Sequence, residues 1–254
     1  MIHRSNRYRI AACFLCLACA VQAYEPEVHA PADSMPNHRR TAVKWIVPAA
    51  CVTYGVIARF DKMSLRSFDL RIAKQVDKHV KKHYVFDDYL QYAPAVFAFG
   101  LDFVPGLRAE HNLRDRTLLL ATSYAFTGIV IYNMKHAISV RRPDGSASNS
   151  FPSGHTAVAF TGAHLLYREY REQSPWIGVG GYAMAATVSV MRVINKKHWM
   201  SDVIAGAGIG ILSVEAAGMM LPVWRRLLGP GEARISIMPV ASGRDVGIRL
   251  VYIF

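Results

Sequence analysis

The chain has 254 residues, of which 52% are hydrophobic and 19% are charged, and 30 Lys and Arg against 18 Asp and Glu give a formal net charge of +12. This hydrophobicity excludes an intrinsically disordered chain, and 18 Gly and 12 Pro are too few for a collagen-like or low-complexity protein. The positive charge alone would allow a soluble protein that binds nucleic acid, so the distribution of the apolar residues has to decide between the classes.

Residues 1–23 have the pattern of a secretory signal peptide. Three arginines precede an uncharged run over residues 10–21, and a small-residue pattern ends at Ala23. An uncleaved signal anchor is the alternative, although the run is short for a membrane span. Removal of this segment takes away three arginines and no acid, which lowers the net charge from +12 to +9, and it leaves Cys51 as the single cysteine. No disulfide framework is therefore predicted.

Residues 24–41 are proline-rich and of mixed charge, and we interpret them as an exposed linker. Apolar blocks follow, and we expect them to be helices: 42–60, 89–107, 117–134, 154–167, 176–191 and 203–223. Residues 117–134 contain no charged side chain and are the clearest candidate for a membrane span, because about 20 residues cross a bilayer core.

Two acidic residues, Asp102 and Glu215, interrupt these blocks. An acid at mid-membrane is unfavourable by about 2.5–3.5 kcal/mol, so we expect both to face the interior of a helical bundle. A soluble helical domain with buried helices is the alternative interpretation of the same blocks.

Residues 59–82 contain eight Lys and Arg residues. Apolar residues recur among them at steps of three and four, which predicts a basic amphipathic helix on a membrane surface. A solvated helix packed on the bundle fits the same periodicity. We interpret residues 42–88 as one unit, a membrane-surface or re-entrant segment followed by this helix.

The C-terminal residues 229–254 have a different pattern. Two segments, 234–240 and 246–254, flank Ser242-Gly243-Arg244-Asp245, and apolar residues alternate in the second segment. This pattern predicts a β-hairpin, which we expect to be a small appendage. The complete prediction is an all-α membrane bundle of five or six spans, with its main domain over residues 89–228 and a short C-terminal hairpin.

Three polar clusters lie at the ends of the apolar blocks. They are Lys135 with Arg142-Pro143, then Pro152-Ser153-Gly154-His155, and then Arg192 with His198 and Asp202. Taken alone, each cluster has a structural explanation as helix-end cations, a helix cap or a helical ion pair. Together they gather cations, two histidines, a carboxylate and backbone donors from three successive junctions.

Hydrolysis of a phosphate ester needs such a set. A phosphate monoester is nearly a dianion at neutral pH. Lys135, Arg142 and Arg192 can bind its oxygens, and the Ser153 hydroxyl and Gly154 amide add donors at a helix N-terminus.

The remaining three residues can carry the bond-making steps. His198 can attack phosphorus if it is neutral and held in one tautomer. Asp202, one helical turn further on, can hold it. His155 is then free to protonate the departing oxygen.

At these residues the sequence resembles the type 2 phosphatidic-acid phosphatase superfamily, whose motifs are Lys-x6-Arg-Pro, Pro-Ser-Gly-His and Ser-Arg-x5-His-x3-Asp. All three are present in order, with Met191 in place of the usual serine. The resemblance implies a helical bundle and a mechanism without a metal or other cofactor, through a phosphohistidine on His198. The stretch over residues 142–152 is also similar to bacterial envelope members that act on lipid A or polyprenyl phosphates.

The arginines predict the orientation in the membrane. Those at the span ends remote from the three clusters are Arg108, Arg114, Arg116, Arg168, Arg171, Arg225 and Arg226. Because Lys and Arg concentrate on the cytoplasmic side, we expect a bacterial inner-membrane protein whose active site faces the periplasm. A cleaved signal then requires residues 42–60 to lie on or dip into the outer leaflet, which leaves five spans; an uncut N-terminus held inside allows six.

The predicted function is a membrane phosphatase for an envelope lipid, with lipid A, polyprenyl diphosphate and phosphatidate as candidate substrates. Three alternatives remain at this point: a soluble periplasmic acid phosphatase, a vanadium-dependent haloperoxidase and a non-catalytic lipid-binding scaffold. Nucleic acid is not expected as a partner, because the cations lie where a membrane and a phosphate ester require them.

Overall fold

The computed structural model describes residues 37–61, 64–80 and 85–229, together with two further segments, 234–242 and 245–253. The predicted signal peptide, residues 1–23, lies outside the described residues, as do residues 24–36 of the predicted linker.

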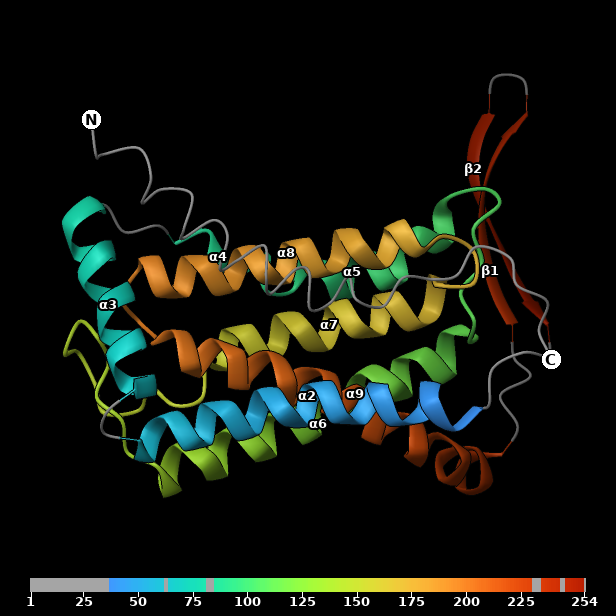
Figure 1. Cartoon of the computed structure of the whole chain (residues 1–254). Coiled ribbons are helices and arrows are strands. Elements are labelled where there is room, and N and C mark those ends of the chain that lie inside the picture. Colours follow the sequence, from blue (N-terminus) through green and yellow to red (C-terminus); the bar gives the residue numbers. More distant parts are fainter. Residues whose placement is uncertain (1–36, 62–63, 81–84, 230–233, 243–244, 254) are drawn as a thin grey trace.

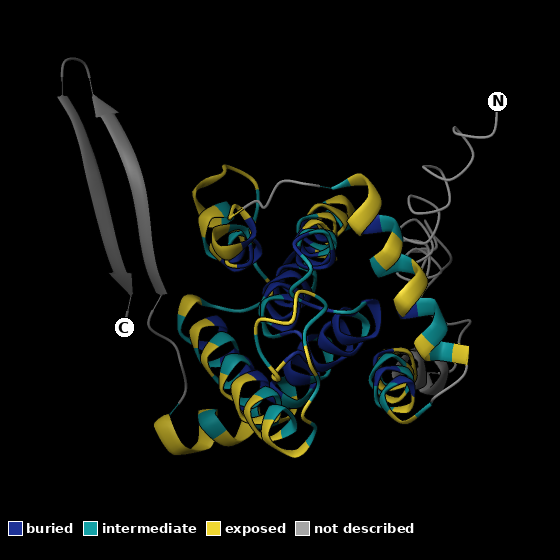
Figure 2. Cartoon of the chain, turned by 90° about the vertical axis from the view of Figure 1, so that its left-hand side faces the viewer, coloured by how far each residue is buried: buried dark blue, intermediate teal, exposed yellow. Residues whose placement is uncertain are grey.

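Residues 37–229 form a helical bundle, which confirms the predicted helical fold (Figure 1). In chain order its elements are α2 (Asn37–Phe60), α3 (Ser64–His79), α4 (Asp87–Leu90), α5 (Ala93–Gly100), the 3₁₀ helix η1 (Leu101–Phe103), α6 (Leu113–Ala137), α7 (Gly154–Tyr170), α8 (Pro175–Ile194) and α9 (Met200–Leu228). Buried residues concentrate on α7 and α9 at the centre of the bundle (Figure 2).

Small residues on α9 allow it to lie between α2 and α7. A Cβ atom at Gly208 would lie 2.4 Å from the Pro48 carbonyl oxygen of α2. A Cβ atom at Gly210 would lie 2.5 Å from the Ala157 carbonyl oxygen of α7. Helix α2, which covers the segment predicted to lie on or dip into the outer leaflet, packs along α9, because this absence of side chains lets the two backbones approach. Its position relative to the membrane stays a prediction.

Three helices in the described part of the chain are long and apolar enough to cross a membrane. They are α6, α8 and α9, with mean hydropathies of 1.3, 1.5 and 1.7. The prediction of five or six spans is not supported: α7 has 17 residues, and the apolar block over 89–107 is divided between α4, α5 and η1. Helix α2 has 24 residues but carries Arg39, Arg40 and Lys44 near its start.

The two acids expected in the bundle interior differ in their surroundings. Glu215 is buried, and its carboxylate contacts His164 Nε2 at 2.9 Å and Lys44 Nζ at 3.2 Å. Asp102 lies instead in the short helix η1 with its side chain 37% exposed, where it pairs with the buried Arg116. The carboxylate is thus partly accessible to solvent while it still compensates the buried arginine.

Five helix ends and one crossing helix meet at the end of the bundle that we call the α3 end. Helices α2, α6 and α8 finish there, α7 and α9 begin there, and α3 lies across it (Figure 1). The predicted basic helix therefore packs on the bundle: Val76 of α3 is buried against Val193, Met200 and Val203. Its outer face exposes Arg66, Arg71, Lys74 and Lys78.

Strands β1 (Arg234–Ser242) and β2 (Asp245–Ile253) follow the bundle. They pair antiparallel, with Arg234 opposite Ile253 and Ser242 opposite Asp245. The two strands overlap the two segments, 234–240 and 246–254, that the sequence pattern indicated.

The contact between α7 and α9 is predicted to be sensitive to a single methyl group. We expect Gly210→Ala to lower the free energy of unfolding by about 1–3 kcal/mol, because its Cβ would meet the α7 backbone and one helix must shift. Thermal unfolding in detergent micelles measures this. Gly180→Ala is the matched control, since no atom lies within 4 Å of its Cβ position and alanine favours a helix. Equal losses in both variants would contradict the packing argument.

Candidate active site

The three polar clusters predicted from the sequence come together at the α3 end. Lys135 lies in the last turn of α6, His155 in the first turn of α7, and Arg192 in the last turn of α8. His198 and Asp202 flank the start of α9. Lys196 adopts φ 57°, a left-handed conformation that turns the chain between α8 and α9 and brings His198 back over the bundle end.

The loop before α7 closes over this end. Ser150 N donates to Val140 O at 2.9 Å, and Ser153 N donates to Asp202 O at 3.1 Å. Trp199 Nε1 donates to Arg141 O at 2.9 Å. The first bond lies within the loop, and the other two tie the loop to the N-terminus of α9, so the motifs are held in place by backbone groups as well as by side chains.

His198 is buried and held in one tautomer. Its Nδ1 lies 2.7 Å from Ser150 O, and because a carbonyl can only accept, Nδ1 carries the proton and Nε2 keeps its lone pair. Burial lowers the pKa of His198; the Asp202 carboxylate opposes this shift, and the charges of Lys135 and Arg192 add to it. A neutral imidazole with a free Nε2 is the form that can act as a nucleophile.

Asp202 reaches His198 mainly through Ser150. Its Oδ2 accepts from Ser150 Oγ at 2.5 Å and from Trp199 N at 2.9 Å, and it lies 3.7 Å from His198 Nδ1. The sequence placed Asp202 as the direct holder of the histidine ring. The structure adds Ser150, whose carbonyl takes the Nδ1 proton while its hydroxyl binds the carboxylate.

His155 and Arg192 share an acidic partner that the sequence analysis did not identify. Asp88 Oδ1 lies 2.9 Å from His155 Nε2 and 3.2 Å from Arg192 NH1. The neighbouring Asp87 is buried and accepts from the same arginine nitrogen at 2.8 Å. Burial and the Arg192 charge lower the pKa of His155, and the Asp88 carboxylate opposes that shift.

No pattern in the sequence indicated that Asp87 and Asp88 of α4 belong to this site. They open an apolar block more than 100 residues before Arg192, and only the packing of α4 against α8 brings them to it.

Two arginines keep donors for an anion. Arg142 Nε and Arg192 Nε are buried and have no hydrogen-bond partner within the described ranges. Lys135 Nζ donates to Asn149 O at 2.5 Å, which holds the lysine beside the same loop. Guanidinium groups of this kind suit phosphate oxygens, since each can present two parallel N–H bonds.

The start of α7 uses Ser153 as a helix cap. Its Oγ accepts from Thr156 N at 3.4 Å and donates to Thr156 Oγ1 at 3.0 Å, and the side chain is fully buried. Gly154 follows as the first residue of α7 and is partly exposed. The helix N-terminus therefore faces the same end as the cations, which favours an anion there.

A cavity of about 460 Å³ opens beside Arg192. It is bordered by acids and lysines, including Asp77, Asp88, Asp144, Lys196 and Lys197. Lys197 Nζ donates to Asp144 Oδ2 at 2.7 Å. Burial opposes ionisation of Asp144, but hydrogen bonds from Lys197 and Ser146 outweigh it and lower the pKa of Asp144 to about 2. Within the described residues, no group of three or more His, Cys, Asp or Glu side chains is placed to hold a metal ion.

Comparison with known families gives an independent result for the same region. Residues 116–224, which include all three motifs, match the PAP2 superfamily. This part of the chain is therefore similar to a PAP2 superfamily domain. Arg59, Asp69, Asp87 and Asp88 lie outside the matched residues.

Curated relatives of the PAP2 domain include two lipid A 1-phosphatases. The Porphyromonas gingivalis enzyme is 46% identical over 92 residues, which cover 36% of this chain and 21% of the relative. The Rhizobium etli enzyme is 32% identical over 109 residues, which cover 36% of this chain and 44% of the relative. The matches thus span less than half the length of either relative.

Two solved structures are also similar. The crystal structure of Aquifex aeolicus LpxE has a TM-score of 0.45 and 20% identity, and the match covers 59% of this chain and 94% of the other. The structure of a transmembrane PAP2 type phosphatidylglycerolphosphate phosphatase from Bacillus subtilis has a TM-score of 0.40 and 18% identity, and the match covers 86% and 97% of the two chains.

Asp88 occupies donors that a bound phosphate would need. We expect Asp88→Asn to tighten the binding of inorganic phosphate by about fivefold, because a competing negative charge is removed from Arg192 and His155. Isothermal titration calorimetry of the detergent-solubilised chain measures this. Asp77→Asn, in the same cavity but paired with Lys196, is the matched control. Equal tightening in both variants would show a general charge effect.

Proposed function

We propose that this chain is a membrane phosphatase that removes phosphate from an envelope lipid through a phosphohistidine on His198. The observation that carries the proposal is the buried, Nδ1-bonded His198 at the helix ends that also bear Lys135 and Arg192. The PAP2 domain and the lipid A 1-phosphatase relatives support it and favour lipid A among the candidate substrates. Polyprenyl diphosphate and phosphatidate carry the same reacting group.

In the first step, His198 Nε2 attacks phosphorus. The new P–N bond forms as the P–O bond to the lipid breaks, and His155 gives its proton to the departing oxygen. Lys135, Arg142 and Arg192 bind the phosphoryl oxygens, with the Gly154 amide as a further donor. The Ser153 hydroxyl joins them only once it releases Thr156 Oγ1, to which it donates in the structure. Asp88 has to leave His155 and Arg192 when the substrate binds, because both groups then contact the phosphate.

In the second step, water attacks the phosphohistidine. His155 takes a proton from that water, the P–N bond breaks, and inorganic phosphate leaves with His198 again neutral. Ser150 keeps the Nδ1 proton in place throughout, and the buried Asp202 carboxylate compensates the positive charge that the ring carries while Nε2 is bonded to phosphorus.

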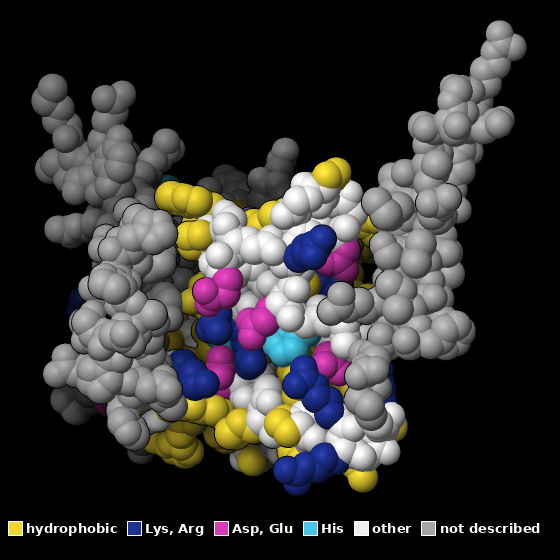
Figure 3. Space-filling view, turned by 90° about the vertical axis from the view of Figure 1, so that its right-hand side faces the viewer, with side chains coloured by type: hydrophobic (Ala, Val, Ile, Leu, Met, Phe, Trp, Pro, Cys, Tyr) yellow, Lys and Arg dark blue, Asp and Glu magenta, His cyan; other side chains and the backbone are white. Residues whose placement is uncertain are grey.

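We place the chain in the bacterial inner membrane with the α3 end facing the periplasm. The opposite end of the bundle carries charged side chains, with Lys and Arg prominent on it (Figure 3). Arg114, Arg225 and Arg226 lie there at the ends of the two longest candidate spans. The tendency of Lys and Arg to remain on the cytoplasmic side supports this orientation.

The central test is phosphate release by the wild type and His198→Ala. We expect the variant to lose at least about 10³-fold in kcat, since the nucleophile itself is removed. Lipid A, polyprenyl diphosphate and phosphatidate in mixed micelles form the substrate panel, with inorganic phosphate as the readout. Equal release by both proteins would disprove the mechanism. Absence of release by the wild type on every substrate would favour a non-catalytic lipid-binding scaffold.

The role of His155 predicts a dependence on pH and on the leaving group. Catalysis needs His198 neutral and His155 protonated, and both pKa values lie below the ordinary 6.5, so kcat/KM should be highest on the acid side of that value. His155→Ala should lose the decline at higher pH. It should also lose about 10²-fold or more on an alkyl phosphate and much less on p-nitrophenyl phosphate, whose leaving group needs no proton. Equal losses on both substrates would contradict the acid role.

A further inference from the structure

Behind Asp202, on the side away from His198, lies an ion pair that the PAP2 match does not include. Arg59, at the end of α2, places NH1 3.6 Å from Asp202 Oδ1, and its NH2 pairs with Asp69 Oδ2 of α3. The side chains of Arg59, Asp69 and Asp202 are 8%, 2% and 0% exposed. Two carboxylates and one guanidinium thus share a site that is almost entirely removed from water.

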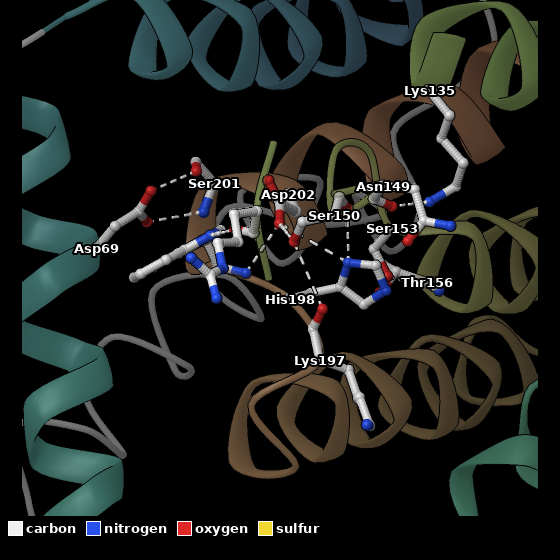
Figure 4. A network of polar contacts seen from close by, with 12 residues as sticks. Asp69, Lys135, Asn149, Ser150, Ser153, Thr156, Lys197, His198, Ser201 and Asp202 are labelled. Carbon is white, nitrogen blue, oxygen red and sulfur yellow. Dashed lines mark hydrogen bonds and ion pairs between the residues drawn. The ribbon is translucent and has the colours of Figure 1, made fainter. Parts of the chain in front are cut away.

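Asp69 also fixes the start of α9. Its Oδ1 accepts from Ser201 N at 3.0 Å and its Oδ2 accepts from Ser201 Oγ at 2.5 Å (Figure 4). Ser201 precedes Asp202, so α3 holds the backbone from which the catalytic carboxylate projects. Gly55 of α2 lets this junction form, because a Cβ there would lie 2.9 Å from Ser201 O.

The charges of the three side chains explain why Asp202 needs both Arg59 and Asp69 beside it. Asp202 Oδ1 has no hydrogen-bond partner in the described part of the chain, so Arg59 is its counter-ion on that side. An unpaired buried carboxylate is strongly unfavourable. Arg59 alone would neutralise Asp202, and Asp69 offsets the arginine. The net negative charge beside His198 is then retained for the step in which the imidazole becomes cationic.

We infer that Arg59 and Asp69 are positioning residues of the active site, which together hold Asp202 ionised, oriented toward Ser150 and still negative toward His198. The inference rests on the proposed phosphatase function. Among the described residues, no contact joins either residue to the proposed phosphate-binding side chains of Lys135, Arg142 and Arg192. Both act through Asp202, one from α2 and the other from α3. Helices α2 and α3 therefore support the active site directly, in addition to packing on the bundle.

The test uses the opposite charges of the pair. Removal of a positive charge in Arg59→Gln should raise the pKa of His198, which moves the acid limb of the kcat/KM profile to higher pH. Removal of a negative charge in Asp69→Asn should move it to lower pH. We expect shifts of about half a unit to one unit, with the double variant in between. The charged groups that act on His198 and stay unchanged are Lys135 of α6, Arg192 of α8 and Asp202 of α9. The other ionisable motif residues, Arg142 and His155, are also kept.

The kinetic constants give a second signature. Each single variant should lose about tenfold or more in kcat with little change in KM, as expected for groups that orient a catalytic residue without touching substrate. Arg59→Lys keeps the charge and should keep the acid limb of the wild type, so it and the isosteric Asp69→Asn carry the test if Arg59→Gln does not fold.

Arg116→Gln is the matched control. It breaks another buried ion pair, with Asp102, at the other end of α6, about 28 Å from Lys135 at 1.5 Å per residue. It should lower thermal stability without moving the acid limb.

The outcomes separate the two proposals. If wild-type protein releases no phosphate, the proposed function fails and this inference fails with it. If the wild type is active and Arg59→Gln and Asp69→Asn keep its acid limb, or shift it in the same direction, the function stands and the positioning role is refuted. Opposite shifts, with the limb unmoved in Arg116→Gln, are the expected result.

Discussion

The buried carboxylate of Asp202 is the constraint around which the α3 end is built. A charge removed from water has to be compensated by hydrogen bonds and opposite charge, or it destabilises the fold by several kcal/mol. Here the compensation comes from Ser150 Oγ, Trp199 N and Arg59, which belong to three separate segments. The N-terminus of α9 adds the favourable end of its dipole. Satisfying this one group brings together α2, the loop before α7 and the start of α9.

The same requirement places His198, the proposed nucleophile. Because Ser150 binds Asp202 through its hydroxyl, its carbonyl is fixed where His198 Nδ1 can donate to it. The tautomer of this histidine is therefore set by a backbone group whose position depends on a buried charge. In our proposal, this arrangement leaves Nε2 available for the phosphate.

The acids of α4 show the other side of this electrostatic arrangement. A cradle of cations suited to phosphate would be unfavourable without anions nearby, and Asp87 and Asp88 supply them. Asp87 is buried and keeps Arg192 in place, whereas the Asp88 side chain is 51% exposed and can move away. One acid therefore serves the structure, and the other is positioned to exchange with substrate.

Part of this organisation is readable in the sequence. The apolar blocks predicted helices α2, α6, α7, α8 and α9 because an uninterrupted run of apolar residues is a local property. The motif spacing likewise predicted Lys135, Arg142, His155, Arg192, His198 and Asp202 as site residues, and the structure brings together the helix ends and the loop that carry these motifs. Tertiary packing was harder to predict. Five or six spans are not supported, since three described helices are long and apolar enough to cross a membrane, and the packing of α2 along α9 was not predicted.

What the sequence by itself determined is the helical bundle and the motif residues of the proposed phosphate-binding site. The tertiary structure alone decided which groups support that site. Arg59 is more than 100 residues from Asp202, Asp69 from Ser201, and Asp87 and Asp88 from Arg192. Asp88 is 67 residues from His155, and Ser150 is about 50 residues from His198 and Asp202. No local pattern encodes such pairings, because they arise from the balance of buried charge, which exists only after the helices have packed together.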